Sequence, residues 1–275
     1  MRKPERIFEG YVLDLDGTVY LGDRLLPTAK ETLCELKRRS RVVYLTNKPL
    51  ETPADYAAKL TKLGIDTSPQ EVVSSTDALL LYLGRYAPDA RLFVIGEPPL
   101  IHMLCSTGYE VVDRAERVDV VVVSFDRTFD YAKLKTAFDA VRQGARIVAT
   151  NPDAYCPTPD GGLPDCAAML AAVEASTGVH AEAIVGKPSL QMAATLLDRL
   201  GVPAEKTLLV GDRLATDIRM AREAGMASAL VLTGATDLGE VLSSDGQPDY
   251  ILKSLSELLP AGGSPDAVVN ATEEG

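Results

Sequence analysis

Two aspartates, Asp14 and Asp16, stand one residue apart at the end of the apolar run YVLDLD. Residues i and i+2 of a β-strand point to the same side, so both carboxylates could face one ligand. Two carboxylates so near each other repel, and this leaves two interpretations. Either the strand reaches water at the turn-forming DGT, or a cation lies between the two carboxylates. A calcium loop is excluded, because Gly17 comes too early and Leu25 stands where such a loop needs a glutamate.

Three further segments place polar side chains where other strands are expected to end. LTN (45–47) supplies a hydroxyl and an amide, and GKPS sets Lys187 just before an expected helix. A cation beside the free N–H groups of a helix N-terminus suits an anion. VGDRLATDI has Asp212 directly after a β-branched run and Asp217 five residues later. Each segment alone also has a plain structural interpretation, as a strand end, a solvated lysine or a helix cap.

Together the four segments suit a metal and a phosphate. The carboxylates of Asp14, Asp16 and Asp212 suit Mg²⁺, which takes one or two carboxylates plus phosphate oxygens and keeps several waters. Such a cation would relieve the repulsion between the first two aspartates. The polar groups of LTN and the Lys187 ammonium suit a phosphate, and a carboxylate nucleophile can form an aspartyl-phosphate.

The composition indicates a globular protein that binds a small molecule. The 275 residues are 46% hydrophobic and 24% charged, and their formal net charge is −11. Nucleic-acid binding is disfavoured because it normally requires a basic surface, and an anionic substrate would need local cations. MRKPERIFEG lacks the apolar core of a signal peptide, and no run reaches the ~20 apolar residues of a membrane span. The four cysteines show no CxxC spacing, so we expect a cytoplasmic protein with reduced thiols and no membrane partner.

Short β-branched runs alternate with helical periodicity along the chain. The alternation predicts an α/β fold: a Rossmann-like, doubly wound parallel sheet with ligands bound beyond the carboxyl ends of its strands. Expected helices include 51–64, with Thr52 as N-cap, and 189–201. The apolar face expected of the second helix carries Leu190, Ala194, Leu197 and Leu200. The expected strands are 11–16, 41–47, 91–96, 119–125, 146–151, 207–212 and 228–234.

The spacing of the polar segments indicates an inserted second domain. Thr46 follows Asp14 by 32 residues, which is enough for one crossover helix, whereas Lys187 follows Thr46 by 141 residues. The longer interval far exceeds one βα unit. We therefore predict a discontinuous core domain (1–78 and 182–260), a smaller α/β domain inserted at 79–181, and a polar, Pro/Gly-rich tail (261–275) that is expected to be disordered.

DLDGTVY, LTN, GKPS and GDRLATDI, in this order, resemble the four motifs of the haloacid-dehalogenase-like (HAD) phosphatases. LDLDGTVYLGDRLLP, GKPS and GDRLATDI are similar in particular to the NagD / para-nitrophenylphosphatase subgroup, and the resemblance covers residues ~10 to 255. It implies a HAD core with an inserted α/β cap of type IIA that closes over the site and sets substrate choice. It also allows a homodimer, because caps of this type can carry dimer contacts in relatives.

The resemblance implies a role for each motif residue. Asp14 would attack phosphorus, and Asp16 would protonate the leaving alcohol and then activate water. Mg²⁺ would be bound by Asp14, the Asp16 carbonyl and Asp212, with Asp217 acting indirectly through these ligands. The residues expected to hold the phosphoryl group or offset its charge are Gly17, Thr46, Asn47 through its backbone, and Lys187.

Two segments of the expected cap, SFD and TNPD, resemble the family's GLD and TNPD motifs. They make Asp126, Asn151 and Asp153 candidates for substrate contact. A polar strand end or turn is the equally open alternative for each of them.

Two positions depart from the family pattern. Asp165 and Cys166 replace small residues of a glycine-rich loop, and if that loop faces the substrate, the added carboxylate should narrow the pocket or disfavour further anions. Lys48 stands where relatives often have asparagine. It either adds a cation near the leaving group or faces solvent, and we favour solvent.

These observations predict a Mg²⁺-dependent phosphomonoester hydrolase that acts on a small phosphorylated metabolite through an aspartyl-phosphate. Sugar phosphates, glycerol phosphate, phosphoglycolate and nucleoside monophosphates all remain open. A phosphomutase of the same superfamily is disfavoured, because those enzymes usually carry the cap between the first two motifs, where this chain has no room for one. A dehalogenase is disfavoured because it would not need Asp16. The alternative from another class is a non-catalytic phosphate-binding or regulatory HAD-like protein. The complete set of Asp14, Asp16, Lys187 and Asp212 argues against it.

Overall fold

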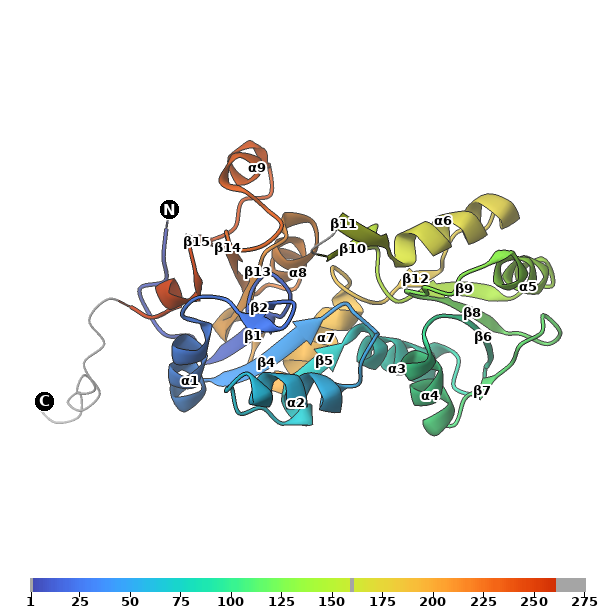
Figure 1. Ribbon diagram of the computed structural model, residues 1–275, viewed down its shortest axis with the longest axis horizontal. Helices are drawn as coiled ribbons and strands as arrows, with labels where there is room; N and C mark the ends of the chain where they lie inside the picture. The colour runs from blue at the N-terminus through green and yellow to red at the C-terminus, as the bar shows by residue number, and fades with distance from the viewer. Residues whose placement is uncertain (1, 159–160, 261–275) are drawn as a thin grey trace, which may run out of the picture.

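The structure is a computed structural model that describes residues 2–158 and 161–260 (Figure 1). It contains two parallel sheets, each covered by helices on both faces. The segment predicted to be a disordered tail, 261–275, lies outside the described residues.

The first sheet has six parallel strands in the order β15-β14-β13-β1-β4-β5. The chain therefore winds outward from β1 in both directions, as in Rossmann-like folds, and the topological switch point lies between β1 and β13. This confirms the predicted doubly wound core. The strands are β1 (Gly10–Asp14), β4 (Arg41–Thr46), β5 (Val72–Ser74), β13 (Thr207–Gly211), β14 (Ala227–Val231) and β15 (Tyr250–Leu252).

Alternate side chains of these strands enter different cores, because successive residues of a strand point to opposite faces. Tyr11 and Leu13 pack with α1 and α2 on one face, whereas Val12 packs with α7 and α8 on the other. The helices are α1 (Ala29–Arg39), α2 (Pro53–Lys62), α7 (Leu190–Leu200), α8 (Arg219–Glu223) and α9 (Leu238–Ser243). A short hairpin, β2 (Tyr20–Leu21) and β3 (Arg24–Leu25), follows β1, and single helical turns are η1 (Pro69–Glu71), η2 (Ala204–Lys206), η3 (Leu214–Ile218) and η4 (Leu255–Leu258).

The second sheet, which we call the cap sheet, is also parallel and has the order β12-β9-β8-β6-β7. Helices α3 and α4 cover one face, and α5 and α6 cover the other. An antiparallel hairpin, β10–β11, extends from it toward the core sheet (Figure 1). The elements are α3 (Ser75–Tyr86), β6 (Arg91–Ile95), α4 (Pro98–Ser106), β7 (Glu110–Val111), β8 (Val120–Val123), α5 (Tyr131–Arg142), β9 (Arg146–Ala149), β10 (Tyr155–Thr158), β11 (Gly161–Pro164), α6 (Cys166–Thr177) and β12 (Ala183–Ile184).

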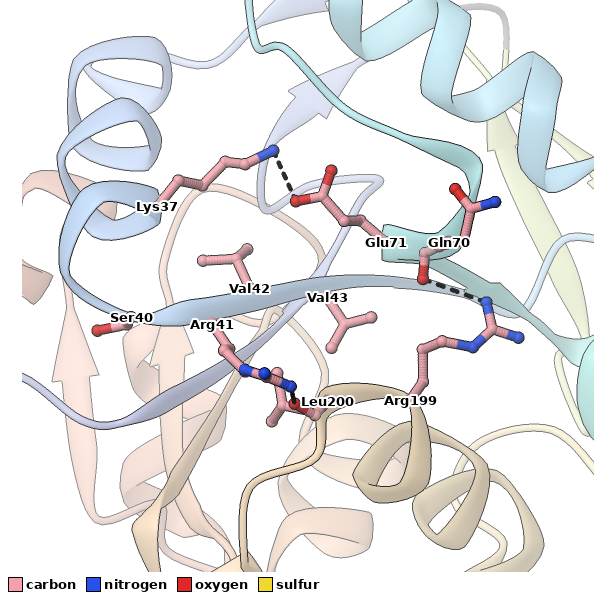
Figure 2. Close-up of a pocket in the computed structure, with 9 residues that line it drawn as sticks. All are labelled: Lys37, Ser40, Arg41, Val42, Val43, Gln70, Glu71, Arg199 and Leu200. Atoms are coloured by element: carbon pink, nitrogen blue, oxygen red, sulfur yellow. Dashed lines mark hydrogen bonds and ion pairs between the residues drawn. The ribbon is translucent and has the colours of Figure 1, made fainter.

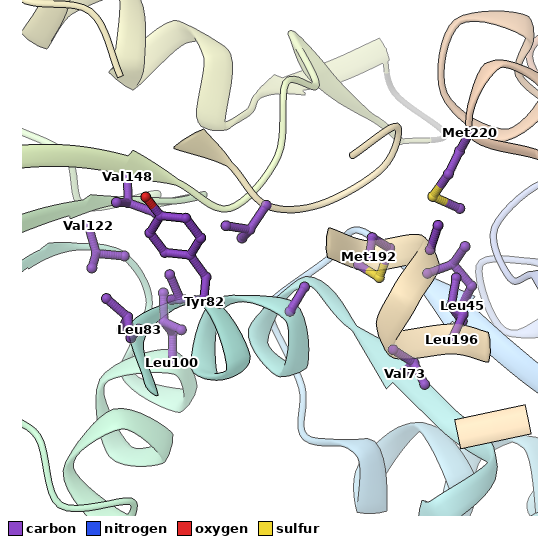
Figure 3. Close-up of a cluster of buried hydrophobic side chains, with 14 of the residues drawn as sticks. Leu45, Val73, Tyr82, Leu83, Leu100, Val122, Val148, Met192, Leu196 and Met220 are labelled. Carbon is purple, nitrogen blue, oxygen red and sulfur yellow. The ribbon is translucent and has the colours of Figure 1, made fainter. Parts of the chain in front are cut away.

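Helix α3 joins the two sheets through one continuous apolar cluster (Figure 3). At one end of the cluster Tyr82 and Leu83 of α3 lie near the strands of the cap sheet, and at the other Met192 and Leu196 of α7 lie on the core sheet. The predicted boundary at 78/79 therefore falls inside α3, and β12 pairs with β9 although 182–184 were predicted to belong to the core. The division into two domains itself stays a prediction.

Helix ends follow the sequence signals, whereas one helix face does not. Thr52 caps α2 in a reciprocal capping box with Asp55, and Gly201 ends α7 in the left-handed conformation. The face of α7 that is buried consists of Met192, Ala193, Thr195, Leu196 and Leu200. Leu190 and Ala194 of the predicted face are exposed, because a rotation of the helix buries the larger Met192 instead. Among the described residues, no helix has the length and apolarity needed to cross a membrane.

Candidate active site

The predicted motif residues meet at one edge of the core sheet. Asp14 is the last residue of β1, Thr46 is the last residue of β4, and Asp212 directly follows β13. Because these three strands are adjacent and parallel, their carboxyl ends lie side by side. The site therefore occupies the switch point of the sheet.

Lys187 lies at the centre of this group. Its ammonium is 2.5 Å from Oδ1 of Asp14 and 2.8 Å from Oδ1 of Asp217, and all three side chains are buried. Asp217 is held in place by η3, a π-helical turn, where its second oxygen accepts a hydrogen bond from the Arg213 N–H at 3.1 Å. The Asp212 carboxylate accepts one from the Ala235 N–H at 2.7 Å.

Burial and mutual repulsion perturb these carboxyl groups strongly. Burial raises the pKa of Asp14 well above its usual range, Lys187 opposes this, and Asp217 and Asp212 raise it further. Burial and the Asp217 charge raise the pKa of Asp212 to about 6. Burial lowers the pKa of the Lys187 ammonium, but Asp14 and Asp217 raise it more, so this lysine stays charged. One ammonium thus faces more negative charge than it can balance.

A divalent cation fits this excess of carboxylates. One oxygen from each of Asp14, Asp212 and Asp217 lies within 4.8 Å of the others, and all three residues are buried. Carboxylate oxygens are the ligands that Mg²⁺ and Ca²⁺ prefer. The Asp16 carboxylate, which the sequence suggested for Mg²⁺ together with Asp14 and Asp212, is not part of this group, and its carbonyl as a metal ligand stays a prediction.

Gly17 forms the turn that follows β1. Its N–H donates to the Tyr20 carbonyl at 2.8 Å, and its contact with phosphate stays a prediction. Its φ is +83°, and a Cβ there would come within 2.5 Å of an Asp212 oxygen. Glycine is therefore needed for the turn and for the close approach of Asp212.

Asp16 interacts with Lys48, a contact we did not favour from the sequence. The Lys48 ammonium is 2.9 Å from Oδ1 of Asp16, and only about a quarter of each side chain is exposed. The preferred interpretation of Lys48 as a solvent-facing residue is therefore wrong. Burial lowers the pKa of Lys48, but Asp16 raises it more, so the net shift is upward.

Asn47 connects the core to the cap sheet. Its side-chain oxygen accepts the Lys187 N–H at 2.8 Å, and its amide donates to Asp153 at 3.0 Å. Its backbone carbonyl accepts the Asn151 amide at 3.3 Å. Asn151 and Asp153, expected to contact substrate, thus lie next to the site with side chains bonded to Asn47. Thr46 accepts the Lys48 N–H on its hydroxyl oxygen at 3.1 Å.

Asp126 is fully occupied within the cap sheet and its loops. One oxygen accepts the N–H and hydroxyl of Thr128, and the other lies 2.5 Å from the Lys133 ammonium. Its side chain has no exposed surface. The structure thus favours the alternative interpretation, a polar strand end, over substrate contact.

Arg213 and Thr216 lie at the site although the sequence reasoning did not single them out. Arg213 is half-buried, and although burial lowers its pKa, Asp153, Asp212 and Asp217 raise it more. The Thr216 hydroxyl is buried and has no hydrogen-bond partner within the described part of the chain. Both residues belong to GDRLATDI, so their position inside the motif was the available signal.

A groove of about 350 Å³ lies at the opposite edge of the core sheet, where β4 begins and α7 ends (Figure 2). Its cations are already paired: Lys37 lies 2.8 Å from Glu71, and Arg199 donates to the Gln70 carbonyl at 3.2 Å. The groove is separate from the carboxylates, so we place the chemistry at the switch point.

Comparison with known proteins agrees with this site. The haloacid dehalogenase-like hydrolase family matches residues 11–110, and a HAD-hydrolase-like family matches residues 184–258. The sugar-phosphatase AraL of Bacillus subtilis is 35% identical over 90% of this chain and 91% of its own length. An acid sugar phosphatase of Staphylococcus aureus is 34% identical over 92% of this chain and 97% of its own.

Solved structures share the whole arrangement. The 4-nitrophenylphosphatase of Thermotoga maritima superimposes with a TM-score of 0.86 at 37% identity and covers 91% of this chain and 96% of its own. A glycerol phosphate phosphatase of Mycobacterium tuberculosis, in complex with magnesium, gives 0.85 at 33% identity and covers 94% and 78%. The chain therefore belongs to the haloacid dehalogenase-like hydrolases, and within them it is a NagD-like phosphatase.

Proposed function

We propose that this phosphatase hydrolyses small phosphorylated metabolites with Mg²⁺ as cofactor, through an aspartyl-phosphate on Asp14. The observation that supports this best is the buried set of Asp14, Lys187, Asp212 and Asp217 at the switch point of the sheet. A non-catalytic phosphate-binding protein would not need the Asp14 carboxylate in contact with the Lys187 ammonium at the place proposed for the phosphoryl group.

In the first step, an Asp14 oxygen attacks phosphorus and the bond from phosphorus to the leaving oxygen breaks. Lys187 engages one Asp14 oxygen, which leaves the other for the attack. Asp16 donates its proton to the leaving oxygen, so that an alcohol departs. Lys187 and the Thr46 hydroxyl offset the charge on the phosphoryl oxygens.

In the second step, the Asp16 carboxylate takes a proton from water, and the water oxygen attacks the phosphorus of the aspartyl-phosphate. The bond between phosphorus and the Asp14 oxygen breaks, so inorganic phosphate leaves and both aspartates return to their first states. Lys48 holds one oxygen of Asp16 in both steps.

Asp14, Asp212 and the Asp16 carbonyl would hold Mg²⁺, with Asp217 oriented by Lys187 and the Arg213 N–H. A bound divalent cation supplies positive charge next to the phosphoryl oxygens and the nucleophile. The names of the relatives, sugar phosphatase and glycerol phosphate phosphatase, favour sugar and glycerol phosphates over phosphoglycolate and nucleotides. A cytoplasmic location, a homodimer and the absence of nucleic-acid and membrane partners stay predictions.

The test is phosphate release from a panel of small phosphomonoesters by the wild type and by Asp14→Asn, each with Mg²⁺ and with chelator. We expect release that depends on metal and is lost in the variant, with the ranking of esters naming the substrate class. Release that persists in Asp14→Asn would exclude this nucleophile. No release from any ester would favour the phosphate-binding alternative.

A further inference from the structure

Asp165 is a buried carboxylate that none of the steps above uses. Only 4% of the residue is exposed, and it is the N-cap of α6, where one oxygen accepts the Cys166 N–H at 2.6 Å. Serine or asparagine would cap a helix equally well without a buried charge. Capping therefore does not explain why a carboxylate stands here.

The position of Asp165 is next to the contact between the cap sheet and the core. Its N–H donates to the Ala154 carbonyl at 3.0 Å, so Asp165 lies beside the turn that carries Asp153. Asp153 in turn accepts the Asn47 amide at 3.0 Å, at the end of the core strand β4. Through Asp153 and Asn47, Asp165 is thus linked to the loop after Thr46, beside the candidate active site.

The cations near Asp165 also serve other carboxylates. Asp153 and Lys48 both act on its carboxyl group, with opposite sign. Lys48, however, already forms the 2.9 Å ion pair with Asp16, the residue proposed to protonate the leaving group. Arg213 in turn interacts with Asp153, Asp212 and Asp217, so both cations near this carboxylate are shared with other carboxylates.

We propose that Asp165 is a specificity-determining residue: its carboxylate excludes phosphate esters whose leaving group carries a second negative charge, and it accepts hydrogen bonds from uncharged, hydroxyl-bearing leaving groups. The proposal rests on the proposed phosphatase function. A carboxylate has only acceptor oxygens, so it binds hydroxyl groups and repels a second carboxylate or phosphate.

The selectivity should depend on pH. Burial raises the pKa of Asp165 to about 6, the Cys166 N–H and Asn151 lower it, Asp153 raises it and Lys48 lowers it. The neighbouring Cys166 thiol, with its pKa raised to about 11 by burial, stays neutral. Asp165 is therefore charged above about pH 6 and neutral well below it, so discrimination against anionic leaving groups should weaken as the pH falls.

The experiment uses two esters that differ in one group. Glycerol 3-phosphate and 3-phosphoglycerate carry CH₂OH and a carboxylate at the same position, so their phosphate groups titrate alike. For each, kcat/KM and the inhibition constant against p-nitrophenyl phosphate are measured near pH 5 and pH 8. The variant is Asp165→Asn, which keeps the cap and removes the charge. The matched control is Asp130→Asn, because Asp130 is also a helix N-cap, on α5, where it accepts the Lys133 N–H at 2.8 Å.

We expect the wild type to prefer glycerol 3-phosphate at pH 8. Asp165→Asn should reduce this preference by about 3- to 100-fold, the range for two charges roughly 6 Å apart at an effective dielectric constant between 80 and 20. The preference should become independent of pH in Asp165→Asn and stay unchanged in Asp130→Asn. An unchanged preference in a folded Asp165→Asn that still hydrolyses p-nitrophenyl phosphate would overturn the proposal.

Other outcomes remain decisive. If neither ester is hydrolysed, the ratio of their inhibition constants gives the same test. If Asp165→Asn does not fold, the same measurements are made on Asp165→Ser, which keeps a capping side chain without the charge. A wild type that releases nothing from p-nitrophenyl phosphate would instead contradict the proposed function, and the specificity proposal with it.

Discussion

Replacing Lys187 by methionine removes the only ammonium seen within 4 Å of Asp14 and Asp217 among the described residues. Methionine has a similar length and no charge, so the change leaves three buried carboxylates within 4.8 Å of one another without that counter-charge. Breaking a buried ion pair by removing one partner costs about 3–5 kcal/mol. We expect Lys187→Met to lower the free energy of unfolding by this amount at pH 8 in chelator.

The loss should shrink in acid. The pKa values of Asp14 and Asp212 are raised by burial, and removing Lys187 raises them further. A carboxyl group whose pKa is higher in the folded than in the unfolded protein lowers the free energy of unfolding at pH values above the folded-state pKa. Below the unfolded-state pKa of about 4 it has no effect, because the group is then protonated in both states. The deficit of Lys187→Met should therefore be complete at pH 8 and smaller at pH 5.

The assay is urea unfolding of the wild type and Lys187→Met at both pH values. Lys135→Met is the control, because its 2.5 Å pair with Asp139 is exposed and should contribute only about 0.3–0.5 kcal/mol. Adding Asp217→Asn to Lys187→Met should recover part of the loss by removing one carboxylate. A variant as stable as the wild type, or a deficit equal at both pH values, would refute this electrostatic account of the site.

Three further predictions concern the backbone, the leaving group and the metal. Gly186→Ala should reduce kcat, because a Cβ there would come within 2.7 Å of the Asn47 side-chain oxygen, whereas Gly84→Ala has open space and should stabilise α3 by about 1 kcal/mol. Lys48→Met should lower kcat about 10- to 100-fold for alkyl phosphates, because Asp16 would no longer be held in place to protonate the leaving oxygen. The decrease in kcat should be much smaller for p-nitrophenyl phosphate, because its leaving group needs no proton. Mg²⁺ at about 100 times its Kd should stabilise the wild type by about 2.7 kcal/mol in a thermal-shift assay, and Asp212→Asn should lose this effect.

Each of these predictions has a contrary result. Equal kcat for Gly186→Ala and the wild type would mean that the loop shifts without cost. Equal losses of Lys48→Met on both kinds of ester would remove its proposed link to leaving-group protonation. A full Mg²⁺ response in Asp212→Asn would place the cation elsewhere.

Long apolar strands and polar strand ends were readable from the sequence. The switch-point site follows from Asp14, Thr46 and Asp212, because each follows a β-branched run and parallel strands bring such ends together. The strands β5 and β15 were missed, since three residues give no periodicity. The predicted buried face of α7 was right at Leu200 and wrong at Leu190 and Ala194, because the helix packs on β4 and α3 at once, which no local pattern records.

The sequence could not predict which side chains of the site pair with one another. Lys48 looked like a surface lysine until the fold placed it against Asp16. For Asp126 the sequence left substrate contact and a polar strand end equally open, and only the structure showed that Lys133 and Thr128 already satisfy it. Asn47 has more than the backbone role expected of it, because its side chain holds both Lys187 and Asp153. These contacts depend on distances between segments that are 32 to 140 residues apart, or on local rotamers, and sequence spacing determines neither.

The central claim is that Asp14 carries the phosphoryl group between the two steps. The most direct test is a rapid acid quench of Asp16→Asn with p-nitrophenyl phosphate and Mg²⁺, because this ester needs no acid in the first step while the second step lacks its base. We predict a burst of one nitrophenol per enzyme and the mass of one phosphoryl group on the peptide that carries Asp14. Turnover without a burst, or a phosphoryl group found on another residue, would contradict the account.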